Sequence, residues 1–191
     1  MTWLGASKVV KIQLAEIRPD YRRLGFGRKL IEAVLVKLKA LGAMVVYLQC
    51  RPTTSEKVWK KIGFSRYPNM PYFDNFNDSE KGRQLYRVLV PFANPLKSSK
   101  AKEKISIWCV ERYQADRLSP KWIWPLVFQQ NTRKLLKPII APVNHKWDIN
   151  WIVHDEVIKS SEIKYFAKGN RDFTGFLIIE DMPSINVVSI R

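Results

Sequence analysis

Hydrophobic and polar positions follow regular patterns through the first part of the chain. Residues 9–17 are rich in β-branched side chains, and apolar and polar residues alternate in the middle of this stretch, as in a half-buried strand. Pro19 ends the predicted strand. Apolar residues then recur at helical spacing, and Gly42 follows them where glycine commonly ends a helix. Residues 44–50 are a nearly continuous apolar run, so the order predicts a strand–helix–strand unit with a parallel, buried pair. The helical positions are Leu30, Ile31, Val34, Leu35, Leu38 and Leu41.

Shorter elements and a polar segment follow this unit. A hydroxyl residue within 53–55 is expected to cap a short helix that Gly63 ends. Residues 85–90 predict another strand, which Pro91 ends. The stretch 94–104 is polar and basic without a periodic apolar face, so it predicts a linker. The chain then divides into residues 1–93, the basic linker 94–104, and a second α+β half, residues 105–191.

The second half has weaker patterns. Residues 105–110 predict a strand, and Ser119 with the proline after it predicts the start of a helix. Residues 163–167 and 174–180 are two strand-like runs around a polar turn, so they predict a β-hairpin. Residues 185–190 predict a last strand.

Charge and composition narrow the class of protein. The 191 residues carry a formal net charge of +16, which attracts phosphates of nucleotides or nucleic acid and acidic protein surfaces. No apolar run reaches the roughly 18 residues of a membrane span, so we expect no membrane contact and a cytoplasmic location. Cys50 and Cys109 lie in apolar stretches far apart in sequence, which predicts buried reduced thiols.

The segment Arg22-Arg23-Leu24-Gly25-Phe26-Gly27 stands between the first predicted strand and the helix. Glycines there let backbone approach a ligand closely, and the free N–H groups of a first helical turn bind phosphate without a metal. The same sequence also fits an ordinary strand-to-helix turn, so the glycines alone leave both interpretations open.

Two separately spaced elements resemble the GNAT superfamily of N-acetyltransferases. The glycine segment with Pro-x-Tyr-Arg before it resembles the family's acyl-CoA motif, and residues 58–64, Val-Trp-Lys-Lys-Ile-Gly-Phe, resemble its aromatic-x-Lys-Leu-Gly-Phe motif. The resemblance covers residues 9–91 and implies acetyl-CoA as co-substrate and an unknown amine as acceptor. It also implies a cofactor site at Ile17, Arg22, Arg23, Leu24, Gly25, Phe26, Gly27, Arg28 and Lys29.

The resemblance also implies an acid and a base for acyl transfer. A tyrosine commonly protonates the departing thiolate, but Trp59 stands at that position, and an indole is no such acid. Tyr67 and Tyr72 lie nearby in sequence as candidate substitutes, although a surface or packing role is the usual one for such tyrosines. Glu16 is the only carboxylate of the first predicted strand and is the candidate base, directly or through water; a solvated surface residue is the alternative.

The family resemblance implies an α+β fold, a GNAT-like mixed sheet flanked by helices. A family member has further strands and helices ahead of the strand assigned to residues 9–17, and residues 104–191 present elements in that missing order. The halves are then either circularly permuted, cut from a tandem pair, or completed in a swapped homodimer. An unrelated appendage is the alternative for the second half.

No metal site is expected from the sequence. The two histidines and their acidic neighbours lack helical or zinc-like spacing. Two functions remain: an acetyl-CoA-dependent N-acetyltransferase, or a catalytically degenerate GNAT-like basic module that binds nucleic acid or a protein partner. The residues weighed as metal ligands are His145, His154, Asp148, Asp155 and Glu156.

Overall fold

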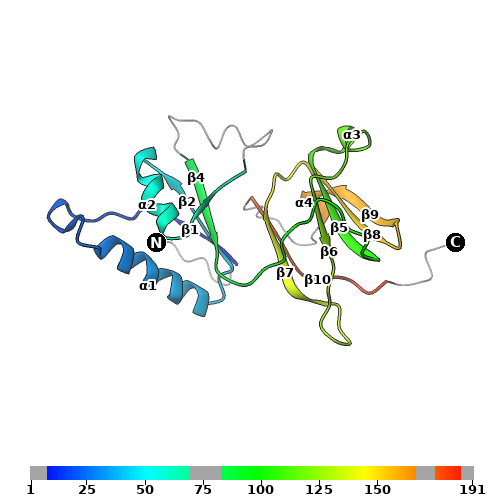
Figure 1. The fold of residues 1–191 in the computed structure, drawn as a ribbon, viewed down its shortest axis with the longest axis horizontal. Helices are drawn as coiled ribbons and strands as arrows, with labels where there is room; N and C mark the ends of the chain where they lie inside the picture. The colour runs from blue at the N-terminus through cyan, green and yellow to red at the C-terminus, as the bar shows by residue number, and fades with distance from the viewer. Residues whose placement is uncertain (1–7, 69–82, 167–174, 186–191) are drawn as a thin grey trace. The chain divides into compact units, whose positions relative to one another are not determined.

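The structure is a computed structural model that describes residues 8–68, 83–166 and 175–185 (Figure 1). The chain divides into two compact units, Met1–Val90 and Pro91–Arg191. Within the described ranges the strands form three sheets, one in the first unit and two in the second. The predicted α+β class is confirmed.

The first unit contains a mixed four-stranded sheet. Its strand order is β1-β2-β4-β3, in which β1 runs parallel to β2 and the other pairs are antiparallel. The predicted parallel pair is confirmed, with Val9 opposite Val45 and Ile12 opposite Leu48. The strands are β1 (Val9–Ile12), β2 (Val45–Cys50), β3 (Ser65–Arg66) and β4 (Arg83–Val88).

Helix α1 (Phe26–Ala40) covers one face of this sheet, as its apolar period predicts. Its buried side chains Ile31, Leu35 and Leu38 join a core with Val46 of β2 and other residues on that face. Gly42 follows with φ of 89°, which a residue without Cβ adopts at little cost. The shorter elements are η1 (Pro19–Tyr21), η2 (Thr53–Ser55) and α2 (Glu56–Lys61).

Strand β1 is shorter than the sequence predicts. It ends at Ile12, so Glu16 lies beyond the strand rather than on it, and the expectation of a carboxylate on the first strand is wrong. Strand β1 ends there because its pairing with β2 ends at the Ile12–Leu48 pair. Residues 13–17 continue without backbone pairing to β2.

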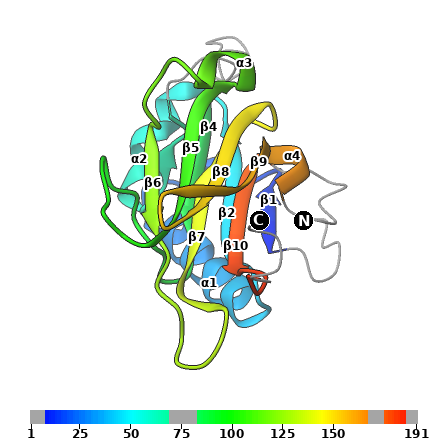
Figure 2. The same ribbon diagram turned by 90° about the vertical axis from the view of Figure 1, so that its right-hand side faces the viewer.

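The second unit is built from two antiparallel sheets. Figure 2 shows β5, β8 and β9 side by side, in a sheet of order β6-β5-β8-β9, and β10 pairs with β7 in the other sheet. The strands are β5 (Glu103–Glu111), β6 (Trp122–Pro125), β7 (Lys134–Pro142), β8 (Trp147–Val153), β9 (Glu156–Glu162) and β10 (Phe176–Asp181). Two one-turn helices complete it, α3 (Arg112–Ala115) and α4 (Ile163–Phe166).

The helix predicted from Ser119 is wrong, because β6 occupies this region. Trp122 and Trp124 alternate with Ile123, and large aromatic and β-branched side chains at period two favour a strand. Trp124 lies opposite Ile105 of β5, and both are fully buried. Ile123 exchanges backbone hydrogen bonds with Leu96 of 2.7 and 3.1 Å.

The hairpin predicted over residues 163–180 is also wrong. Its first arm is helix α4, and its second arm, β10, pairs with β7, where Ile178 lies opposite Ile140. Strand β10 is thus paired inside its own unit. Permutation of the halves and completion by a second chain therefore stay predictions. The last predicted strand, 185–190, lies outside the described residues except for its first.

The segment 94–104, predicted as a linker, begins and ends in contact with the second unit. Leu96 bridges to Ile123, and β5 starts at Glu103. The boundary between the compact units is Val90–Pro91. Both cysteines are free, and burial raises the pKa of the Cys109 thiol to about 12. That thiol stays protonated at neutral pH.

Candidate functional site

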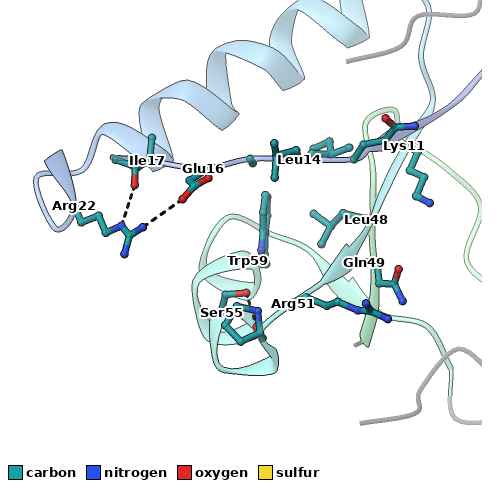
Figure 3. Close-up of a pocket in the computed structure, with 14 residues that line it drawn as sticks. Lys11, Leu14, Glu16, Ile17, Arg22, Leu48, Gln49, Arg51, Ser55 and Trp59 are labelled. Carbon is teal, nitrogen blue, oxygen red and sulfur yellow. Dashed lines mark hydrogen bonds and ion pairs between the residues drawn. The ribbon is translucent and has the colours of Figure 1, made fainter. Parts of the chain in front are cut away.

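A cleft opens in the first unit where β1 and β2 separate. Beyond the Ile12–Leu48 pair, a cavity of about 660 Å³ lies between residues 11–17, the end of β2 and the start of α2 (Figure 3). The lining residues are Lys11, Ile12, Gln13, Leu14, Ala15, Glu16, Ile17, Arg22, Leu48, Gln49, Arg51, Pro52, Ser55 and Trp59.

The middle of the cleft is apolar. Figure 3 shows Leu14 above the Trp59 ring, with Leu48 beside them. The Leu14 side chain is 82% exposed, which is costly for a large aliphatic group in water. Trp59 is held edge-on against Phe64 at 5.2 Å between ring centroids. These side chains suit the uncharged stretch of an elongated ligand.

One end of the cleft adjoins the start of helix α1. Ile17 lines the cleft, its carbonyl accepts a 2.9 Å hydrogen bond from Arg22 Nε, and its Cγ1 lies 3.4 Å from where a Cβ on Gly27 would stand. Gly25 is the N-cap residue with φ of 82°, and no side chain caps the helix. The N–H groups of the first turn therefore lack a side-chain acceptor, as an anion-binding helix start requires.

The side chains expected at the cofactor site differ in the interactions that they make with the rest of the protein. Arg22 forms a 3.6 Å ion pair with Glu16, and Arg28 Nε donates a 2.7 Å hydrogen bond to Glu32. This contact raises the pKa of Arg28. Arg23 and Lys29 are exposed, and neither forms an ion pair with another described residue. Leu24 and Phe26 are exposed beside them.

The structure separates the two residues expected to be catalytic. Glu16 lines the cleft at the end near Arg22. Tyr67 is only 4% exposed, packs edge-on to Tyr86 at 5.4 Å, and is not among the residues that line the cleft. Burial raises the pKa of Tyr67, with smaller contributions from Tyr47 and Tyr86. Tyr72, the alternative acid, lies outside the described residues.

Several cleft residues were not singled out from the sequence. Ser55, considered only as a helix cap, makes no side-chain cap; its hydroxyl donates to the Pro52 carbonyl at 2.8 Å and lies 3.0 Å from Cys50 Sγ. Lys11 of β1 and Gln49 of β2 line the cleft, and so does Arg51, the residue directly after β2. Strand alternation places them on one face, but it does not reveal that the strands separate there.

No group of three or more His, Cys, Asp and Glu side chains is arranged to hold a metal ion in the described ranges. Among the helices of those ranges, none is both long and apolar enough to cross a bilayer.

Comparison with known proteins gives the class of the first unit. Residues 1–73 match the family described as FR47-like protein, which is GNAT-related. This match, with the mixed sheet and the glycine segment at the start of α1, confirms the GNAT superfamily assignment for that part of the chain. The matched region ends within the first unit and does not reach the second.

Among solved structures, the chain is similar to Ard1 from Thermoplasma volcanium. The identity is 22%, the match covers 45% of this chain and 59% of that chain, and the TM-score is 0.36. The chain thus spans less than two thirds of that protein's length. No curated protein matches the chain.

Proposed function

We propose that the first unit binds acetyl-CoA in the cleft and transfers the acetyl group to an amine. The observation that carries this proposal is the position of the cleft: it opens between a parallel strand pair and adjoins an uncapped helix start through Ile17. A pyrophosphate at that helix start would accept hydrogen bonds from the first-turn N–H groups. Arg23 and Lys29 would add positive charge beside it.

In the proposed reaction, the acceptor nitrogen attacks the thioester carbonyl carbon. The carbon–sulfur bond breaks, CoA leaves as the thiolate, and the amine loses one proton. Glu16 is the proposed acceptor of that proton, directly or through water, because it is the only carboxylate among the described residues that line the cleft. The thiolate gains a proton, so the products are an N-acetylated amine and CoA thiol.

A second function is favoured by Trp59. This side chain lines the cleft where the family resemblance implies an acid, and Tyr67 is packed away from the lining. A protein that binds acetyl-CoA without turning it over would fit these residues, and the net charge of +16 would suit a basic module for nucleic acid or an acidic protein. Binding of acetyl-CoA together with acetylation of an amine would exclude this second function.

Acetyl-CoA is expected to raise the thermal stability of the protein. A ligand that binds only the folded state at 100 times its Kd stabilises that state by about 2.7 kcal/mol. Differential scanning calorimetry with millimolar acetyl-CoA measures this, with acetyl-pantetheine, which lacks the nucleotide, as control. An unchanged melting temperature with acetyl-CoA would contradict the cofactor assignment.

Trp59→Tyr is expected to increase kcat for acetyl transfer by about tenfold, a part of the 10²–10⁴ that positioned acids supply. A phenol at this position in the cleft can donate a proton to the departing thiolate, which the indole does not. Thiol release from acetyl-CoA measures the rate, and Trp59→Phe is the matched control because it removes the indole without adding a hydroxyl. Equal rates for the Tyr and Phe variants would show that no acid is missing.

A further inference from the structure

Residues 13–17 contain the proposed base and lie beyond the end of a strand. Strand β1 ends at Ile12, and its pairing with β2 ends at the Ile12–Leu48 pair. A paired strand is held in place by the backbone hydrogen bonds of its ladder, and residues 13–17 do not form that ladder with β2. The position of Glu16 in the cleft therefore depends on other contacts of this segment.

The side chain of Arg22 supplies two such contacts. Its Nε donates a 2.9 Å hydrogen bond to the Ile17 carbonyl oxygen, and its Nη2 lies 3.6 Å from Glu16 Oε1. Figure 3 shows both interactions meeting at the one guanidinium group. Nε and Nη2 lie on the same edge of this planar group, so the bond from Nε to the carbonyl also fixes the direction in which Nη2 meets the carboxylate.

The backbone of Arg22 is itself held in place. Arg22 directly follows η1, and its backbone N–H donates a 3.1 Å hydrogen bond to the Pro19 carbonyl. Proline has a fixed φ angle, which limits the conformations open to this turn. Ile17, which Arg22 contacts, has its Cγ1 3.4 Å from where a Cβ on Gly27 would stand. Residues 16–17 therefore lie between the Arg22 side chain and the first turn of α1.

We propose that Arg22 is a positioning residue for Glu16 and not a ligand of the CoA phosphates. This inference rests on the proposed acetyl transfer, in which Glu16 accepts the amine proton. The family resemblance implies Arg22 at the cofactor site, but one edge of its guanidinium is directed at residues 16–17. The N–H groups of the first turn of α1, with Arg23 and Lys29 beside them, are then the donors to the phosphates.

The contact between Arg22 and Glu16 matters more for the rate than for folding. A general base must lie within hydrogen-bond reach of the proton that it removes, directly or through one water, and a displacement of about 1 Å can lower a rate about 100-fold. An ion pair between side chains that are 55% and 68% exposed contributes little to folding stability. Removal of the Arg22 side chain should therefore slow acetyl transfer in a protein that remains folded.

The first test compares Arg22→Ala with wild type on two acetyl donors, acetyl-CoA and acetyl-pantetheine, which lacks the nucleotide. Thiol release is followed with three probe amines, ethanolamine, spermidine and triglycine. We expect kcat to fall about tenfold with both donors, a part of the 10²–10⁴ that a positioned base supplies, while the Kd for acetyl-CoA stays as in wild type. An unchanged rate with acetyl-pantetheine, or a Kd for acetyl-CoA raised about tenfold, would overturn the inference, because Arg22 would then not act on Glu16 alone.

A double-mutant cycle tests whether Arg22 acts through Glu16. Glu16→Gln should itself lower kcat, and Arg22→Ala should lower it no further when Glu16→Gln is already present. Residues that act as a unit have non-additive effects of this kind. An equal loss of kcat on Arg22→Ala in both backgrounds would show that Arg22 contributes independently of Glu16, contrary to the inference.

Arg18→Ala is the matched control. Arg18 is an exposed arginine of the same segment that pairs with Asp20 at 3.5 Å and is not among the residues that line the cleft. Its loss should change neither kcat nor the Kd for acetyl-CoA. Where urea unfolding shows that Arg22→Ala is less stable than wild type, Arg22→Met takes its place, because methionine keeps a long apolar side chain without the guanidinium donors.

The outcomes separate this inference from the function on which it rests. Acetylation of a probe amine at a rate that Glu16→Gln leaves unchanged would overturn the role of Arg22 while acetyl transfer stands. Binding of acetyl-CoA by wild type without acetylation of any of the three amines would count against acetyl transfer itself, and the inference would fall with it.

Discussion

Gly27→Val is expected to abolish acetyl-CoA binding while the protein stays folded. A valine side chain on the first turn of α1 would stand where a pyrophosphate must approach the backbone N–H groups. Each hydrogen bond to a charged group contributes about 1.5–3 kcal/mol, so losing those of one phosphate weakens binding by about 100-fold or more. Isothermal titration calorimetry with acetyl-CoA measures the loss.

The local geometry explains why folding should survive. A Cβ at Gly27 would meet only Ile17 Cγ1, at 3.4 Å, and Ile17 Cδ1, at 4.0 Å, both at flexible positions of one side chain. Valine is also no worse than glycine in a helix. Ala33→Val, at an exposed position of the same helix, is the matched control. A folded Gly27→Val protein that binds acetyl-CoA as wild type does would show that the glycine segment has been misinterpreted.

Glu56→Gln is expected to cost about 2 kcal/mol of folding free energy, the range of charge-assisted hydrogen bonds. Glu56 is 4% exposed and holds Arg66, Arg83 and Lys60 together at the start of α2. A neutral amide would leave these cations without their common counter-charge. Urea unfolding followed by tryptophan fluorescence measures the change. Glu32→Gln, which removes an exposed pair with Arg28, should cost a few tenths of a kcal/mol.

The same carboxylate makes stability depend on pH. Hydrogen bonds from Arg66, and to a lesser extent from Lys60 and Arg83, hold the pKa of Glu56 well below its usual range against the opposing effect of burial. In the unfolded chain, the Glu56 carboxylate protonates near pH 4.3. Its contribution to the free energy of unfolding is therefore fully present above that pH and is lost as pH falls toward the pKa of the folded state. The advantage of wild type over Glu56→Gln should therefore be constant at neutral pH and decrease progressively as pH falls below about 4. An advantage as large at pH 2.5 as at pH 7 would contradict this account.

The parts of the fold that the sequence predicted correctly have strong, long patterns. Helix α1 spans 15 residues with an uninterrupted apolar stripe and a glycine after it, and β2 is a buried apolar run. The missed elements are short. Trp122–Pro125 and Ile163–Phe166 are four residues each, too few for a period of 2 to be distinguished from 3.6. Whether such a short segment forms a helix or a strand depends on the residues that it packs and pairs with, which local sequence does not show.

The candidate site was predictable only in part for a related reason. The glycine segment is contiguous, so its position at the start of α1 follows from local sequence. Tyr67 is near Trp59 along the chain, but it packs against Tyr86 of β4 and is buried away from the cleft. Lys11 and Arg51 are brought into one cleft by the point at which β1 leaves β2, which sequence alone does not fix.

Hydrogen–deuterium exchange with and without acetyl-CoA tests the central claim most directly, because it reports both binding and its location. We expect slower exchange with acetyl-CoA in peptides that cover residues 13–17 and 22–29, where the cleft adjoins α1, and unchanged exchange in β5, β8 and β9. Exchange that acetyl-CoA leaves unchanged throughout the chain, or slows only in the second unit, would contradict the proposal that this cleft is an acetyl-CoA site.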